Sequence, residues 1–293
     1  MESESAKGHL TALLTVVIWG TTFISTKVLL NDFLPVEILI VRFVIGFGAL
    51  WLACPHPLKN TGTRRELTFA AAGLCGICLY YLLENIALTY TMASNVGVII
   101  SVAPFFTALL SRICFRNARR LGIYFFAGFI AAMAGIILIS FNGSSLRLDP
   151  TGDLLALLAA FVWACYSILT KKISSYGYPT ISSTRRIFFY GILFMIPSLF
   201  FFDAKWDPPR FTDPVCLLNI IFLGLGASAL CFVTWNFAVR VLDPVKTSVY
   251  IYLVPVVTVV SSVLILHEPI TPSAAAGIAL TLGGLLLSQR RKI

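Results

Sequence analysis

The sequence predicts an all-α integral membrane protein in which about ten transmembrane helices form two inverted repeats of five. Three observations predict this fold class: an apolar composition, ten apolar runs of membrane-spanning length, and a long internal repeat. Of the 293 residues, 58% are hydrophobic and 12% are charged, whereas ordinary soluble domains carry about 25% charged residues. Much of the surface is therefore expected to face lipid.

The apolar runs have the length of about 17–25 residues that a helix needs to cross a hydrocarbon core of about 30 Å. The first run follows Glu2 and Glu4, with no basic segment before it and no small-residue cleavage site after it. We interpret it as the first span and not as a cleaved signal peptide. The predicted spans lie near residues 10–29, 36–54, 67–88, 93–111, 121–141, 153–170, 185–202, 215–237, 245–266 and 272–288.

Residue types recur in the second half of the chain at a nearly constant offset. At 144 residues the recurring pairs are Trp19 and Trp163, Lys27 and Lys171, Pro35 and Pro179, and Arg42 and Arg186. At 151 residues they are Asn85 and Asn236, Ala87 and Ala238, and Pro104 and Pro255. This period predicts two repeats, at 8–141 and 152–290. Because five spans are an odd number, the second repeat is expected to lie inverted in the membrane.

Basic residues are distributed unevenly between the two sides of the predicted membrane. If the N-terminus lies inside, the inner segments hold most Lys and Arg residues, and the outer loops keep only Arg147, Lys205 and Arg210. This asymmetry follows the positive-inside rule and predicts that both termini are cytoplasmic. The expected location is the plasma membrane, the inner membrane if the source is bacterial.

Several other classes of function find no support in the sequence. The net charge of +9 is spread over short loops, so it does not indicate a nucleic-acid partner. Cys75 and Cys78 have metal-like spacing but no second pair, and we interpret them as apolar helix residues. The common signatures of hydrolases, metalloproteases and nucleotide-binding loops are missing. We therefore expect neither an enzyme nor a cofactor or metal site.

Prolines and glycines mark helix kinks and helix contacts. Pro104 and Pro255 fall in the fourth span of each repeat, where a missing backbone donor predicts a kink; ordinary helix bending is the alternative. Small residues in the fifth spans, among them Gly128, Gly135 and Gly284, allow close helix approach. They could join the two repeats or two protomers, so a monomer and a homodimer both stay open.

Glu84 and Asn85 interrupt the apolar run of the third span. An ionisable group within a span usually faces the bundle interior or a water-filled path. We interpret the pair as binding substrate or a coupling proton. The alternative is an acid fixed by hydrogen bonds near a helix end.

Four cations related by the repeat lie near span ends, and we interpret them as gating or charge-attracting groups: Lys27, Arg42, Lys171 and Arg186. They could draw in a carboxylate or phosphate. The alternative is snorkelling at the interface, with Asp32 and Glu37 as outer partners. Arg42 lies deepest, and a functional role is favoured there.

Aromatic side chains are abundant within the spans, and some of them are expected to line a cavity. Aromatic faces can stack on planar substrates or hold amines by cation–π contact; the alternatives are interfacial anchoring and ordinary packing. The predicted binding set adds to Glu84 and Asn85 the residues Trp19, Tyr80, Tyr81, Trp163, Tyr166, Trp235, Asn236 and Tyr250.

The motifs resemble the EamA domain of the drug/metabolite transporter superfamily, twice over nearly the whole chain. The resemblance rests on Trp19-Gly, Pro35 with Arg42-Phe43, the run from Asn85 to Ser94, and Asn236 and Val254-Pro255 in the second half. One departure is Asn117, which stands 151 residues before Glu268 and puts in doubt any role for a pair of acids. The resemblance implies a ten-helix carrier, often an exporter of amino acids or related metabolites. It also implies a central cavity lined by spans one, three, four, six, eight and nine.

The leading hypothesis is a secondary transporter that exports amino acids or related small metabolites by alternating access. Its energy would come from an ion gradient, with protons as one candidate coupling ion, from exchange, or from the substrate's own gradient. Export or exchange of larger or cationic compounds, such as drugs, nucleoside-like metabolites or S-adenosylmethionine, is the alternative within transport. A membrane scaffold or sensor is the competing class. The expected partners are a small-molecule substrate and the lipid bilayer.

Overall fold

The structure is a computed structural model that describes residues 2–58, 61–90, 93–115, 122–140, 149–202, 208–266 and 271–289. Within these ranges the chain forms helices and no strand. The first half forms α1 (Glu2–Leu29), α2 (Pro35–Ala53), α3 (Gly62–Gly73), η1 (Leu74–Leu79), α4 (Tyr80–Tyr90), α5 (Ala93–Ile100), α6 (Ala103–Cys114) and α7 (Ile123–Ser140). The second half forms α8 (Pro150–Ser174), α9 (Thr180–Phe201), η2 (Pro208–Thr212), α10 (Pro214–Ile221), η3 (Phe222–Leu230), α11 (Cys231–Leu242), α12 (Pro244–Ser248), η4 (Val249–Tyr252), α13 (Leu253–Leu266) and α14 (Pro272–Gln289).

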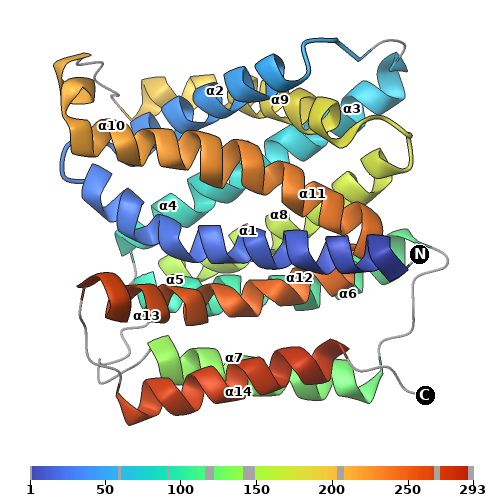
Figure 1. Ribbon diagram of the computed structural model, residues 1–293, viewed down its shortest axis with the longest axis vertical. Helices are drawn as coiled ribbons and strands as arrows, with labels where there is room; N and C mark the ends of the chain where they lie inside the picture. The colour runs from blue at the N-terminus through green and yellow to red at the C-terminus, as the bar shows by residue number, and fades with distance from the viewer. Residues whose placement is uncertain are drawn as a thin grey trace.

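The helices lie side by side, and α7 and α14 form one edge of the bundle (Figure 1). Among the described residues, seven helical stretches are long and apolar enough to cross a membrane, and the apolar helices at 123–139 and 272–288 are shorter. Together with α1, which contains the first apolar run, they confirm the predicted all-α membrane fold of about ten helices.

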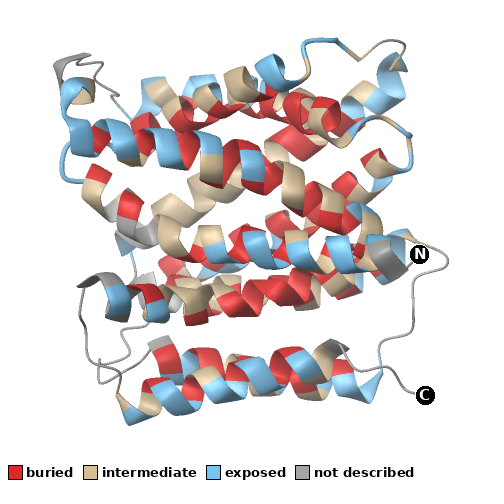
Figure 2. Cartoon of the chain, in the orientation of Figure 1, coloured by how far each residue is buried: buried red, intermediate tan, exposed pale blue. Residues whose placement is uncertain are grey.

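Buried residues concentrate in the middle of the bundle and on the facing sides of α7 and α14 (Figure 2). The outward faces are apolar as well, and Leu52 and Phe201 are 83% and 84% exposed. Exposing such a surface to water is unfavourable, whereas contact with lipid tails is not, because the bilayer core is itself apolar. The exposed side chains therefore agree with a bundle surrounded by lipid.

Helix starts carry short-range signals that the sequence supplies directly. The Asp149 side chain accepts hydrogen bonds of 2.9 Å from the backbone N–H groups of Thr151 and Gly152, at the start of α8. Asp213 caps α10 in the same way by accepting from Cys216 N–H at 2.8 Å. A proline follows each cap at the first helical position, where its missing N–H costs nothing.

Repeat-related helices run in opposite directions. In α2 and α9, the rings of Phe43 and Phe188 lie 5.2 Å apart, while Cys54 near the end of α2 contacts Ser182 at the start of α9. The two helices are thus antiparallel, as repeat-related spans must be if the second repeat is inverted. The contacts between α7 and α14 show the same antiparallel relation, so the inverted repeat is confirmed.

The glycines of the fifth spans join the two repeats within one chain. A Cβ atom added at Gly135 would lie 2.6 Å from the Gly277 carbonyl oxygen. One added at Gly284 would lie 2.6 Å from the Gly128 carbonyl oxygen. Only glycine permits backbones to approach this closely. The sequence leaves open whether these residues join the two repeats or two protomers. In the structure they join the two repeats.

Spans three and eight each contain a π-helical segment at repeat-related positions. η1 ends at Leu79 and η3 ends at Leu230, 151 residues apart. A π-helical turn accommodates an additional residue and occurs frequently at functional sites. In both repeats the segment directly precedes the helix that carries the candidate polar residues, α4 and α11.

The helical path is interrupted directly before each mid-span proline. In span four, α5 ends at Ile100 and α6 begins at Ala103, with Pro104 in its first turn. In span nine, the 3-10 segment η4 precedes α13, whose third residue is Pro255. Since proline lacks the donor of the i→i−4 bond, both interruptions lie where the sequence predicts kinks.

Candidate functional site

Tryptophans from both repeats meet at the centre of the bundle. The ring centroids of Trp19 on α1 and Trp163 on α8 lie 5.4 Å apart in an edge-on contact. Trp235 on α11 joins them, at 5.1 Å from Trp19 and 6.0 Å from Trp163, and Phe232 contacts Trp19 and Trp163 at 6.0 and 6.2 Å. These four residues form the aromatic cluster.

The three indole N–H groups of the aromatic cluster differ in their partners. Trp19 Nε1 donates a hydrogen bond of 3.1 Å to the carbonyl oxygen of Ala227 in η3. Within the described residues, Trp163 Nε1 and Trp235 Nε1 are buried and have no hydrogen-bond partner. A buried donor without a partner is costly, so these two groups are candidates to bind an oxygen atom of a substrate.

α4 places Tyr80, Tyr81 and Glu84 beside the aromatic cluster. The Tyr80 ring lies 4.9 Å from both Trp163 and Tyr81. Its hydroxyl donates a long hydrogen bond of 3.4 Å to Glu84 Oε1. Glu84 and Asn85 are both half-buried, so the carboxylate lies beside a mostly aromatic wall.

Arg42 on α2 is the buried cation of this region. Its side chain is 6% exposed, and Nε donates to Ser228 Oγ in η3 at 2.9 Å. The guanidinium lies 5.3 Å from the ring centres of Tyr81 and Phe43. Among the described residues Arg42 forms no ion pair, although it acts electrostatically on Glu84.

The outer acid expected to pair with the cations of spans one and two has another partner. Glu37 accepts from the backbone N–H of Leu34 at 2.9 Å and pairs with Arg210 at 3.5 Å. Arg210 in η2 also donates to the Asp32 carbonyl oxygen. Arg42 points inward toward η3 and donates to Ser228 Oγ, away from the snorkelling alternative.

The second-repeat cations have acidic partners. Lys171 Nζ pairs with the Asp243 carboxylate and donates to the Arg240 carbonyl oxygen at 3.2 Å. Arg186 donates to Glu66 Oε1 through Nη2 at 2.8 Å and through Nε at 3.2 Å. The Lys27 side chain lies outside the described part of the structure. Of the three predicted cations whose side chains the structure describes, Arg42 lies beside Tyr81 of the predicted binding set, whereas Arg186 lies 6.0 Å from the Tyr190 ring.

Tyr166 and Asn236 form a buried hydrogen-bond chain together with Thr184. The Tyr166 hydroxyl donates to Asn236 Oδ1 at 2.8 Å, and Asn236 Nδ2 donates to Thr184 Oγ1 at 3.0 Å. Because Asn236 uses its amide at both ends, this chain fixes α8, α9 and α11 to one another. The Tyr166 ring also contacts Trp163, with centroids 5.1 Å apart, so the chain lies next to the aromatic cluster.

Replacing Tyr166 by phenylalanine is expected to lower the free energy of unfolding by about 1–3 kcal/mol, because Asn236 Oδ1 would lose its donor in a buried place. Unfolding of the purified protein in mixed micelles measures the loss. Tyr124→Phe, on the exposed face of α7, is the matched control. Unchanged stability together with a higher KM would mean that the Tyr166 hydroxyl serves the substrate instead.

Tyr250 contacts the start of α1. Its hydroxyl forms a 2.7 Å hydrogen bond with His9 Nδ1. The His9 and Tyr250 rings are 6.0 Å apart. Tyr250 thus joins span nine to one end of span one.

The structure adds site residues that the sequence does not single out. Phe43 and Phe232 complete the wall around Trp163 and Arg42, Ser228 orients Arg42, and Thr184 ends the chain from Tyr166. Phe232 precedes Trp235 by three positions on the same helix face, a spacing that could have identified it. Ser228 lies in the π-helical segment η3, where helical spacing fails, and no sequence signal points to it.

Comparisons with known proteins agree with this architecture. The EamA-like transporter family matches residues 6–141 and 150–289. An uncharacterized transporter of Archaeoglobus fulgidus is 28% identical over 98% of this chain and 99% of its own. A solved crystal structure matches with a TM-score of 0.81 at 20% identity, over 97% of both chains, and this likeness concerns the fold alone.

Two further relatives have names that state a substrate. A probable terminal-alkyne amino-acid exporter of Streptantibioticus cattleyicolor is 28% identical over 96% of this chain and 93% of its own. A probable amino-acid metabolite efflux pump of Escherichia coli is 27% identical over 97% of this chain and 95% of its own.

Proposed function

The chain belongs to the EamA-like transporter family, and from that premise we propose that it exports amino acids or related small metabolites as a secondary carrier. Both repeats contribute to the candidate site, so one chain supplies all of the residues that the proposal needs. Alternating access would come from movement of the two repeats around the site. The charge asymmetry of the loops supports cytoplasmic termini.

The observation that carries the proposal is the buried guanidinium of Arg42. Arg42 forms no ion pair among the described residues, and Glu84 acts on it only electrostatically. A buried cation held in this way is costly in a medium of low dielectric constant. A carboxylate of the substrate would supply the missing charge, and the Arg42 guanidinium could bind it through two parallel hydrogen bonds. The unpaired indole N–H groups of Trp163 and Trp235 are further donors for carboxylate oxygens.

Glu84 supplies the opposite charge. Its carboxylate lies beside the Tyr80 hydroxyl, and aromatic faces next to a carboxylate form a suitable surface for an ammonium group. A cation site and an anion site close together fit a zwitterion. Two relatives with names that refer to amino acids agree with this substrate class.

The alternative is export of larger or cationic compounds, and the aromatic wall around Glu84 is the observation that favours it. Tyr80, Tyr81 and Trp163 present rings on which a planar cation could stack. Such a substrate would use Glu84 but would have no need for Arg42. The two readings therefore differ in whether a carboxylate is required.

Liposomes that contain only the purified chain, loaded with a mixed pool of amino acids and cationic metabolites, test the proposal. We expect amino acids to be released, at a rate that an imposed pH gradient changes. Release of cationic compounds alone would favour the alternative. If the folded protein released neither class, the proposed substrate class would be refuted and a scaffold or sensor function favoured.

Replacing Glu84 by glutamine is expected to remove the pH dependence of transport, because the amide keeps the size of the side chain but cannot take up a proton. Flux measured at several pH values should follow a flat profile in Glu84→Gln. Glu4→Gln, at the exposed start of α1, is the control and should keep the profile of the unmodified protein. An unchanged profile in Glu84→Gln would assign the coupling proton to another group.

A further inference from the structure

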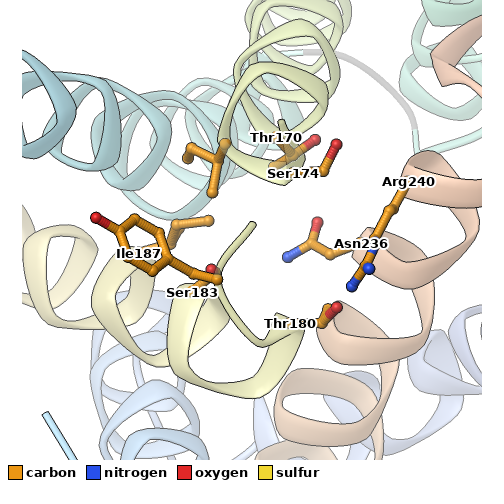
Figure 3. A pocket seen from close by; sticks show the side chains of 9 residues that line it. Thr170, Ser174, Thr180, Ser183, Ile187, Asn236 and Arg240 are labelled. Atoms are coloured by element: carbon orange, nitrogen blue, oxygen red, sulfur yellow. The ribbon is translucent and has the colours of Figure 1, made fainter. Parts of the chain in front are cut away.

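A polar pocket lies where α8 and α11 end and α9 begins. It is partly open to solvent. Figure 3 shows polar side chains from all three helices around this space. The polar residues of its lining include Thr170, Ser174, Thr180, Ser183, Asn236 and Arg240.

The pocket is at the end of the bundle that carries the N-terminus. A Cβ atom added at Gly8, near the start of α1, would lie 2.8 Å from the side chain of Leu242, the last residue of α11. The charge asymmetry of the loops predicts that this end faces the cytoplasm. An exporter takes up its substrate from that side.

Arg240 gives the pocket a positive charge. The nearby acid Asp243 is paired with Lys171, and Arg240 forms no ion pair among the residues that the structure describes. The guanidinium points toward Asn236 and Thr180 in Figure 3. Arginine provides a planar set of donors that matches the geometry of a carboxylate.

At three of the four serine and threonine positions of the pocket, the first repeat has an apolar side chain, whereas Thr170 is matched by Thr26. The positions 144 residues before Ser174, Thr180 and Ser183 are occupied by Leu30, Val36 and Leu39. Leu39 is 4% exposed and Ser183 is 7% exposed, so both positions are buried in the same architecture. At these three positions the first repeat therefore packs with apolar side chains where the second repeat places hydroxyl groups.

The Tyr166–Asn236–Thr184 chain separates the pocket from the aromatic cluster. Asn236 lines the pocket and is 7% exposed. On its other side it accepts from Tyr166, whose ring contacts Trp163. A ligand in the pocket would thus lie one hydrogen-bonded layer away from the candidate central site.

We propose that this pocket is a second binding site, which takes the carboxylate group of the substrate at the cytoplasmic end before the substrate reaches Arg42. Arg240 binds the carboxylate, and the hydroxyl groups of Thr180 and Ser183 and the second N–H of the Asn236 amide donate the remaining hydrogen bonds to its oxygens. This inference rests on the proposed export of carboxylate-bearing metabolites. It adds a site with its own ligand chemistry, which can be measured without transport.

Binding of propionate, the probe, to the purified full chain can be followed by saturation-transfer NMR. We expect a signal from propionate and none from its neutral analogue propionamide. Arg240→Gln should weaken propionate binding roughly tenfold, because it removes a charge-assisted hydrogen bond. The double variant Thr180→Val with Ser183→Leu, which copies the first repeat, should weaken it as well.

Lys172→Gln is the matched control, since it removes a cation at the same end from an exposed position outside the pocket lining. A propionate signal that survives in Lys172→Gln and falls in Arg240→Gln supports the pocket. No signal with the unmodified protein, or an equal signal in Arg240→Gln, overturns it. If the signal follows Arg240 but liposomes release no amino acid, the pocket stands and the proposed function fails.

Discussion

Replacing Arg42 by glutamine is expected to lower kcat/KM for a carboxylate substrate by about 30-fold or more. Truncating one partner of a buried, hydrogen-bonded charge pair costs about 2–5 kcal/mol, and each 1.4 kcal/mol is a factor of ten. The glutamine keeps a donor for Ser228 Oγ but loses the charge. Because Arg42 forms no ion pair among the described residues, the variant should still fold.

The kinetics of efflux from liposomes test this expectation with two substrates. One is the amino acid released fastest by the unmodified protein, and the other is its amide, which lacks the carboxylate. The loss of kcat/KM should be confined to the amino acid. Arg65→Gln is the control: Arg65 lies outside the site, with its guanidinium 5.2 Å from the Tyr176 ring. An equal loss for both substrates in Arg42→Gln would show that Arg42 serves the fold and not the carboxylate.

Replacing Gly284 by alanine is expected to have the largest effect on stability. The added Cβ atom would lie 2.4 Å from the Ala132 backbone nitrogen and 2.6 Å from the Gly128 carbonyl oxygen. Backbone atoms cannot move away as a flexible side chain can, so α7 and α14 would have to separate. Overpacking costs typically about 1–3 kcal/mol and more where nothing yields, and we expect at least the upper value here.

The neighbouring glycine provides the control for this substitution. A Cβ atom added at Gly283 would meet nothing within 4 Å, so Gly283→Ala changes the same helix at no steric cost. Thermal unfolding in detergent should show a lower Tm for Gly284→Ala and an unchanged Tm for Gly283→Ala. Equal Tm values for both variants would contradict the close contact between α7 and α14.

The sequence predicts those features that depend on repeated residue types. Trp19 and Trp163 recur at a fixed offset, and they meet at the centre because inverted repeats bring equivalent positions together around one axis. The glycines of the fifth spans are predictable as contact residues for a similar reason, since small residues on a helix serve close approach. The sequence leaves the partner open, and packing of α7 against α14 decides it.

The partners of charged residues are not predictable in this way. Arg42 and Arg186 occupy equivalent positions, yet Arg186 is bound by Glu66 and Arg42 lies against aromatic rings. The reason is that the position equivalent to Glu66, at the 151-residue offset, is Leu217. Which acid pairs with which cation thus depends on single substitutions between the repeats and on distant segments such as η2. The periodicity of the helices predicts neither of these.

The paired π-helical segments determine the rotation of the helices that follow them. Successive residues of an α-helix are rotated by about 100°, because 3.6 residues complete a turn. An extra residue accommodated in η1 therefore changes the direction in which every later side chain of that span points. After this rotation Glu84 faces Tyr80 and the bundle centre. Trp235 faces the bundle centre after the corresponding rotation in η3. A helical wheel drawn through the whole span would miss this rotation of about 100° per extra residue, so the orientation of the site depends on the irregularity of the helix.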